Sequence, residues 1–225
     1  MHKVGISREA MELIERRRGR LRLYPELDLN RLALVVIDMQ NCFVAPGGAL
    51  EVPIARNIVP NINRLASACR RRGVPVIWVH HVLPSGEGSW KLFLDHFVTG
   101  EMKEKALSHL TEGWGTEFWK ELEIKEGDYI VEKTRYSALI PGSSELERLL
   151  RGLGKDTIII TGTRTSICCE STARDAMMLD FKVIFVSDAT ATFTDQEHQA
   201  TLNIMAMSFA DVVTTEELVR QIEAS

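Results

Sequence analysis

The sequence lacks any long hydrophobic run, and no stretch of its 225 residues approaches the roughly 18 apolar residues of a membrane-spanning helix. Its N-terminus also lacks the apolar core and cleavage site of a secretory signal peptide. We therefore expect a cytoplasmic protein that does not bind membranes. The net charge of −4 argues against a general nucleic-acid binder, and we interpret the basic run at residues 16–22 as a solvated surface segment.

Cysteine is scarce as well, and the spacings typical of metal sites are missing. The four cysteines are Cys42, Cys69, Cys168 and Cys169, which do not form a disulfide framework in a cytoplasmic chain of this length. No Cys-x-x-Cys or His-x-x-x-His occurs, and His80 and His81, as strand neighbours, would point to opposite faces. No Gly-x-Gly-x-x-Gly follows the first predicted strand, which disfavours a dinucleotide-binding protein. We expect neither a metal nor a cofactor.

The sequence does contain a regular alternation of short apolar stretches and amphipathic segments. Predicted strands lie at residues 31–37, 74–79, 129–132, 157–161, 182–186 and 211–213. Helical spacing is found at residues 55–72, 143–153, 168–179, 195–209 and 215–222. This alternation predicts a single α/β domain over residues 1–225, built on a doubly wound parallel sheet.

Two segments stand outside this alternation. Residues 1–29 form an N-terminal extension, in which residues 7–19 are predicted to be a charged amphipathic helix on the surface or at a subunit contact. Residues 83–126 have an irregular pattern and hold three of the four tryptophans. Long irregular insertions in compact domains are usually functional, so we expect this segment to be a lid or an interface arm.

Three ionisable residues follow three of the predicted strands. Asp38 comes directly after the first strand, Lys133 after the third and Cys168 soon after the fourth. Ligands bind beyond the carboxyl ends of parallel strands, so these side chains are candidates for one site. Each residue alone also has an ordinary structural interpretation: Asp38 as a helix cap or a loop carboxylate facing solvent, Lys133 as a surface lysine, and Cys168 as a structural thiol.

Together the three groups have the chemistry of a hydrolytic site. A carboxylate facing Cys168 can take the thiol proton and return it to a leaving amine. A predicted helix that begins at Cys168, together with the charge of Lys133, would lower the pKa of this thiol. Backbone N–H groups in the turn before Cys168 are placed to stabilise an acyl oxygen.

Three blocks of sequence carry a resemblance to a known family. They are Val35-Val-Ile-Asp-Met-Gln-Asn-Cys-Phe43, Glu132-Lys-Thr-Arg-Tyr-Ser137 and Gly162-Thr-Arg-Thr-Ser-Ile-Cys-Cys-Glu-Ser-Thr-Ala-Arg-Asp175. In this order they resemble the isochorismatase-like cysteine hydrolases, over residues 31–218. The resemblance implies a three-layer α/β/α fold with a six-stranded parallel sheet, assembled as a homodimer or homotetramer.

The resemblance also implies roles for individual residues. Asp38 would be the base, Lys133 its charge partner and Cys168 the nucleophile, which forms a thioester. A cis peptide bond would join Thr163 to Arg164, and the backbone N–H groups of Arg164 and Cys168 would form the oxyanion hole. Arg164 itself replaces what is often a small apolar residue, so its guanidinium either approaches a carboxylate-bearing substrate or faces solvent.

The same blocks narrow the expected activity. True isochorismatases lack the nucleophilic cysteine, so Cys168 favours hydrolysis of a C–N bond. Nicotinamidases bind a metal through an Asp-x-His segment, where this chain has His-His-Val-Leu-Pro at residues 80–84. We therefore expect a metal-independent amidohydrolase that acts on a small ureido, carbamoyl or amide substrate.

Two alternatives remain open at this stage. One is a nicotinamidase-type amidase, and the other is a non-catalytic protein that binds a small molecule on the same scaffold. Residues expected to line the substrate pocket are Gln40, Phe43, Trp90 and Tyr136. Ser166 stands where many relatives have Asn or Asp, which leaves the hydrogen bonding of this turn open.

Overall fold

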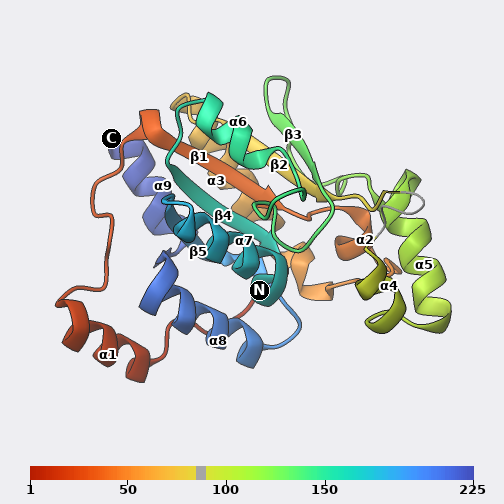
Figure 1. The fold of residues 1–225 in the computed structure, drawn as a ribbon. Coiled ribbons are helices and arrows are strands. Elements are labelled where there is room, and N and C mark those ends of the chain that lie inside the picture. Colours follow the sequence, from red (N-terminus) through yellow and green to blue (C-terminus); the bar gives the residue numbers. More distant parts are fainter. Residues whose placement is uncertain (85–89) are drawn as a thin grey trace.

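Unbroken apolar runs form the centre of a parallel sheet in the computed structural model, which describes residues 1–84 and 90–225 (Figure 1). Every residue of β1 (Leu32–Ile37) and β4 (Thr157–Thr163) is buried, as expected of strands covered on both faces. The other strands are β2 (Val76–His81), β3 (Tyr129–Lys133), β5 (Lys182–Ala191) and β6 (Asp211–Val213). The strand order β3-β2-β1-β4-β5-β6, with all pairs parallel, confirms the predicted six-stranded doubly wound sheet.

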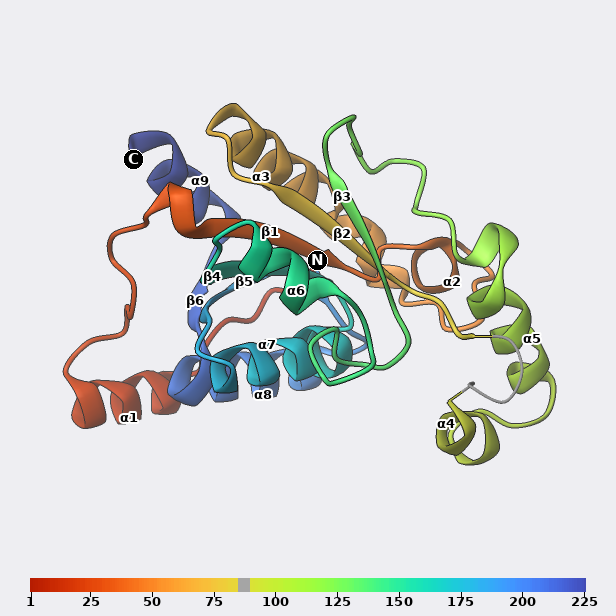
Figure 2. The ribbon, with the colours of Figure 1, turned by 45° about the horizontal axis from the view of Figure 1, so that its top comes forward.

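Helices cover both faces of this sheet (Figure 2). The α-helices are α1 (Arg8–Arg18), α2 (Asn41–Val44), α3 (Val59–Arg71), α4 (Lys91–His96), α5 (Gly100–Thr111), α6 (Leu146–Gly152), α7 (Glu170–Met178), α8 (Asp195–Ile204) and α9 (Thr215–Ala224). Alternate residues of β1 sort into two cores: Leu34 packs with α3 and α9, and Val35 packs with α6, α7 and α8. The chain runs outward from β1 to β3 and returns to β4, so the strand order reverses between β1 and β4, where ligands bind in such sheets.

Several predicted boundaries are wrong, each for a local reason. The helix predicted at residues 55–72 is split, because Pro60 favours a helix start: a 3₁₀ segment, Pro53–Ile58, precedes α3. The helix predicted from residue 143 begins only at Leu146, since the hydroxyls of Ser143 and Ser144 donate to loop carbonyls. β2 continues past Val79 to His81, because both histidines pair with β3.

The segment predicted to be irregular, residues 83–126, contains two helices. α4 and α5 each bury too few apolar residues to produce a clear helical pattern in the sequence. α5, for example, buries only Ala106 and Leu110. Residues 85–89 of this segment lie outside the described residues. Nowhere in the described ranges does a helix have the length and apolar character needed to cross a bilayer.

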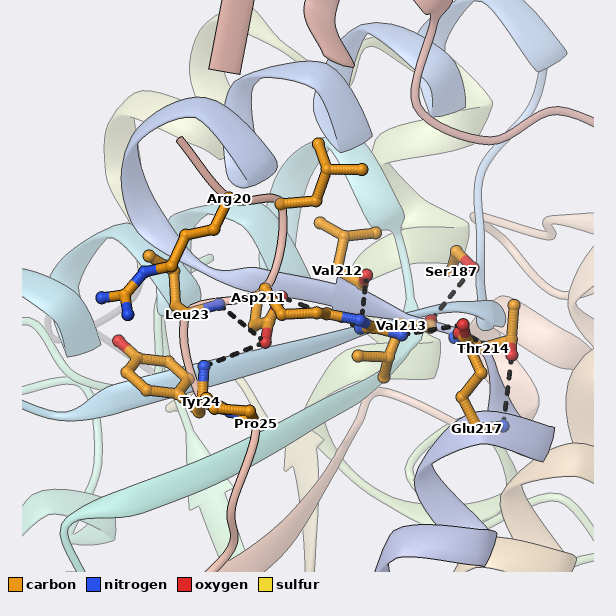
Figure 3. Close-up of polar contacts among 12 residues, drawn as sticks. Arg20, Leu23, Tyr24, Pro25, Ser187, Asp211, Val212, Val213, Thr214 and Glu217 are labelled. Atoms are coloured by element: carbon orange, nitrogen blue, oxygen red, sulfur yellow. Dashed lines mark hydrogen bonds and ion pairs between the residues drawn. The ribbon is translucent and has the colours of Figure 1, made fainter. Parts of the chain in front are cut away.

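The N-terminal extension is attached along the edge strand β6 (Figure 3). Helix α1 matches the prediction, with Ser7 as its N-cap and Gly19 in the left-handed region at its end. Beyond it, the buried carboxylate of Asp211 accepts hydrogen bonds from the backbone N–H groups of Leu23 (3.1 Å) and Tyr24 (3.2 Å). The extension thereby covers an edge that would otherwise present unpaired backbone groups.

Gly162 gives a test of how β1 and β4 are packed. It faces Ile37 in the ladder and has φ +110°, and a Cβ atom there would overlap the carbonyl oxygen of Ile37. We expect Gly162→Ala to lower the free energy of unfolding by about 3 kcal/mol, measured by urea denaturation. Gly152→Ala is the control, because nothing lies within 4 Å of its added methyl group and alanine favours helix. Equal midpoints for the two variants would contradict this packing.

Candidate active site

Asp38 stands at the point where the chain leaves β1. It has φ +54°, in the left-handed region that few residues other than glycine, asparagine and aspartate adopt. Its backbone N–H donates to the carbonyl of Val79 at 2.8 Å, which ties the turn to β2. The side chain is completely buried. The turn therefore holds a carboxylate inside the protein at the carboxyl end of the sheet.

Lys133 is the last residue of β3 and its side chain is also completely buried. Its Nζ lies 2.8 Å from Oδ2 of Asp38 and donates to the carbonyl of Arg135 at 2.9 Å. An isolated buried ammonium would be strongly destabilising, and this ion pair with its added hydrogen bond compensates the loss of water. Asp38 and Lys133 are thus brought together, and neither is a surface residue.

Cys168 lies in a π-helical turn, Thr165–Cys169, that precedes α7. The prediction of an α-helix beginning at Cys168 is wrong, because this turn is wound more loosely: the N–H group of Cys169 donates to the carbonyl of Arg164, five residues earlier. The predicted cis peptide bond between Thr163 and Arg164 is confirmed. The neighbouring Cys169 points into the core, and its thiol contacts the carbonyl of Thr161 at 3.7 Å.

The predicted lowering of the Cys168 pKa is wrong. Burial raises the pKa of this thiol to about 12; the charge of Lys133 and a hydrogen bond from the Arg164 backbone oppose the shift, and Asp38 adds to it. The sequence could suggest the neighbouring charges, but it could not show that Cys168 is buried, with only 5% of the residue exposed. In the resting protein the sulfur carries its proton, so it needs a base to become nucleophilic.

The paired groups have the protonation states that such a base requires. Burial raises the pKa of Asp38, and the charge of Lys133 and hydrogen bonds from Lys133 and Cys168 limit that rise. Burial opposes the charge of Lys133, but Asp38 and Cys168 outweigh it and raise the pKa of the lysine. Lys133 therefore stays an ammonium, while Asp38 is a carboxylate with an increased affinity for a proton.

A cavity of about 70 Å³ adjoins Cys168. It is lined by Phe43, Leu50, His81, Phe93, Tyr136, Arg164, Ile167, Cys168 and Phe193. Of the residues expected at the pocket, Phe43 and Tyr136 line this cavity. Trp90 lines a neighbouring cavity of about 520 Å³ and meets Tyr136 with ring centroids 4.5 Å apart. The wall around the sulfur is thus largely apolar and aromatic.

Gln40, also expected at the pocket, does not line either cavity. Its Nε2 donates to the carbonyls of His81 (3.0 Å) and Gly115 (3.2 Å), and its Oε1 accepts from the His81 N–H at 2.6 Å. This completely buried amide joins the turn after β1 to the end of β2. It holds the site's framework together and does not face the sulfur.

Sequence reasoning missed five cavity residues, which are Leu50, His81, Phe93, Ile167 and Phe193. His81 pairs with Lys133 in the ladder, and burial together with the charge of Lys133 places its pKa well below the usual range, so its imidazole is neutral. The sequence held a signal for His81. If the strand predicted to end at Val79 is extended by two residues, His81 becomes its last residue and lies at the carboxyl edge of the sheet, beside Lys133. In the part of the chain that the structure describes, no three His, Cys, Asp or Glu side chains are grouped to hold a metal ion.

Comparisons with known proteins agree with this architecture. The model of the isochorismatase domain family matches residues 32–217. The protein YwoC of Bacillus subtilis, described as an uncharacterised isochorismatase family protein, is 32% identical over 88% of this chain and 97% of its own. Nicotinamidase 3 of Arabidopsis thaliana is 35% identical over 84% and 88%, and the ureidoacrylate amidohydrolase RutB of Klebsiella pneumoniae is 32% identical over 70% and 72%.

Solved structures show the same likeness. A cysteine hydrolase from Pseudomonas syringae pv. phaseolicola superposes with a TM-score of 0.78 at 32% identity, covering 91% of this chain and 98% of the other. The N-carbamoylsarcosine amidase of Thermoplasma acidophilum gives a TM-score of 0.67 at 27% identity, covering 83% and 97%. The matched domain, the sheet order and these relatives together show that the chain belongs to the isochorismatase-like cysteine hydrolase superfamily.

Proposed function

We propose that this hydrolase is a cysteine amidohydrolase that cleaves a C–N bond of a small ureido, carbamoyl or amide compound without a metal. The observation that carries the proposal is the buried Asp38–Lys133 pair, 2.8 Å apart, whose charges and hydrogen bonds act on the thiol of Cys168 beside a small cavity. Among its relatives, RutB is named an ureidoacrylate amidohydrolase and the Thermoplasma acidophilum protein an N-carbamoylsarcosine amidase.

The first half of the reaction follows from these positions. Asp38 takes the proton of Cys168 as the sulfur attacks the substrate carbonyl carbon, so the negative charge moves from the carboxylate to the carbonyl oxygen. Lys133 remains charged and compensates the changing charge on both neighbours. The backbone N–H groups of Arg164 and Cys168 form the oxyanion hole.

The second half regenerates the thiol. Asp38 gives its proton to the leaving nitrogen as the C–N bond breaks, which releases ammonia or an amine and leaves a thioester on Cys168. Water then attacks the thioester, Asp38 accepts a water proton and passes it to the departing sulfur. Because the resting thiol has a pKa near 12, transfer of its proton to Asp38 must be coupled to the attack on the carbonyl.

The cavity suits a small carbonyl group with an anionic tail. The guanidinium of Arg164 lies 4.2 Å from the Phe193 ring centroid and 3.6 Å from Glu197, and its buried Nε has no hydrogen-bond partner among the described residues. Tyr136 lies across the cavity; burial raises the pKa of its hydroxyl, and the charge of Arg164 opposes that rise. We therefore favour ureido and carbamoyl compounds that carry a carboxylate, and we propose that residues 83–126, which supply Phe93, act as the lid.

Nicotinamide is the second candidate, and the aromatic wall favours it. Phe93 and Tyr136 meet edge to face with centroids 6.2 Å apart, and Phe43 and Phe193 complete a surface that fits a planar ring. Nicotinamidase 3 is a relative at 35% identity. A substrate panel of N-carbamoyl amino acids, biuret, ureidoacrylate analogues and nicotinamide, assayed for ammonia release, separates the two candidates.

Replacement of the nucleophile is the direct test of the amidase proposal. Cys168→Ala should lower kcat at least about a thousandfold in the ammonia assay, because no other group can form the thioester. Cys69→Ala is the control, since Cys69 is buried in the core on α3 away from the cavity. Ammonia release by Cys168→Ala at the rate of the Cys69→Ala protein would refute the proposal.

The pH profile tests Asp38 as the base. Burial raises its pKa above 3.8, and Asp38 must be ionised to accept the thiol proton, so kcat/KM should fall with decreasing pH at a midpoint above that of an ordinary aspartate. If the Lys133→Met protein keeps measurable activity, this midpoint should move to higher pH. The positive charge of Lys133, which limits the rise in the Asp38 pKa, is then absent. A midpoint that stays in place or moves to lower pH would show that another group titrates.

Arg164→Gln tests the preference for an anionic substrate. We expect KM for an N-carbamoyl amino acid to rise about 10- to 100-fold, with a much smaller change for the uncharged amide of the same compound. Arg151→Gln is a matched control, because Arg151 lies 4.0 Å from the Phe181 ring centroid and 3.6 Å from Glu147, far from the cavity. Equal effects on the charged and uncharged substrates would argue against the carboxylate contact.

A further inference from the structure

The second residue of the chain is buried against the back of the active-site turn. His2 is 9% exposed, although it lies 30 residues before the matched family domain, which begins at residue 32. Its Nδ1 lies 2.7 Å from Oδ1 of Asp195, and its Nε2 accepts the backbone N–H of Thr192 at 3.1 Å. Figure 1 shows the N-terminus beside α8, the helix that Asp195 begins.

These two contacts fix the protonation of the ring. A backbone N–H can only donate, so Nε2 of His2 must be the unprotonated nitrogen. The proton is therefore on Nδ1, which donates to the carboxylate of Asp195. His2 is held as one neutral tautomer, with one edge on the helix and the other on the loop after β5.

His198 continues this connection toward the nucleophile. Its ring stacks on that of His2, with centroids 4.1 Å apart and planes inclined by 16°. Its Nδ1 lies 3.0 Å from the hydroxyl of Thr165, the first residue of the π-helical turn that carries Cys168. Burial lowers the pKa of His198 to about 4, so the His198 ring is neutral where it stacks on His2.

A second contact joins the same loop to the same turn. The hydroxyls of Thr192 and Ser166 lie 3.0 Å apart, and the Thr192 hydroxyl donates to Glu197 at 3.2 Å. His2 therefore reaches the turn by two routes, through the ring of His198 to Thr165 and through Thr192 to Ser166. Both Thr165 and Thr192 are completely buried, so their hydroxyls lie away from bulk solvent.

We propose that His2 is a positioning residue for the hydrolysis: through His198 and Thr192 it holds the turn of residues 165–169 in the geometry that places the Cys168 sulfur beside Asp38. The kinetic part of this inference rests on the proposed amidase function. The contact with Thr192 carries the effect, and the contact with Asp195 orients the ring. A small displacement of a nucleophile lowers the chemical rate far more than it lowers substrate affinity.

Two substitutions separate the two edges of the ring. His2→Gln keeps an acceptor near the position of Nε2, whereas His2→Asn keeps a donor near Nδ1 and leaves the Thr192 N–H unpaired. We expect kcat to fall about tenfold in His2→Asn and less than about threefold in His2→Gln, with KM within about twofold of the unmodified chain in both. An affinity tag placed at the C-terminus keeps residue 2 in its native position.

Asn203→Ala is the matched control for a purely structural role. Asn203 lies on α8 and anchors the same N-terminal segment, accepting the Ser7 N–H at 2.8 Å, and its side chain makes no hydrogen bond to the turn of residues 165–169. This variant should lower the thermal midpoint without changing kcat. Equal losses of kcat in Asn203→Ala and His2→Asn would overturn the proposal, because a loosened segment alone would then explain them.

Hydrogen–deuterium exchange gives a readout that needs no substrate. In His2→Asn, amides of residues 164–169 should exchange at least about tenfold faster, while Asn203→Ala leaves them unchanged. Unchanged exchange in a folded His2→Asn protein would overturn the proposal even if the chain proves inactive on every amide. If His2→Asn does not fold, Ser166→Ala removes the contact with Thr192 from the side of the turn and should reproduce the exchange and kcat effects. Wild-type values in that variant would equally refute the proposal.

Discussion

The ion pair between Asp38 and Lys133 is the constraint on which the rest of the site depends. Both side chains are completely removed from water, and they lie at the ends of β1 and β3, which are separated by β2. Two strand spacings amount to about 10 Å, so only a long cationic side chain can reach across the intervening strand. Moving either charge into the interior alone would cost several kcal/mol, so the fold must present both together.

This constraint accounts for several features that carry no reactive group. The left-handed backbone of Asp38 and the hydrogen bond from its N–H to Val79 keep the carboxylate over the end of β2. Gln40 binds the same strand end at His81, and the Arg135 carbonyl accepts from the ammonium of Lys133. The two charged groups are therefore placed by each other and by backbone hydrogen bonds of the segments that carry them, an arrangement of the kind that preorganised catalysis requires.

The sequence predicted the framework well because its signals are local. Unbroken apolar runs marked the buried strands, and Asp38 and Lys133 directly follow or end two of them. What failed depends on contacts made by distant segments. The histidines of residues 80–81 were predicted to lie beyond the strand that ends at Val79, yet pairing with β3 and ring contacts with Phe43 and Trp90 make His81 part of the interior. The pKa of Cys168 was predicted in the wrong direction because no local pattern records how deeply a residue is buried.

The N-terminal extension illustrates the same limit in its strongest form. A histidine at position 2 of a charged segment gives no sign of burial, and its partners lie about 190 residues later in the chain. Only the folded structure shows that α8 and the loop after β5 leave a site for an imidazole beside His198. Because the extension is also attached to Asp211 at the far edge of the sheet, residues 2 and 23–24 hold it at both ends. A segment held at two points has little freedom left, so its first residues can support the turn that carries Cys168 at a small entropic cost.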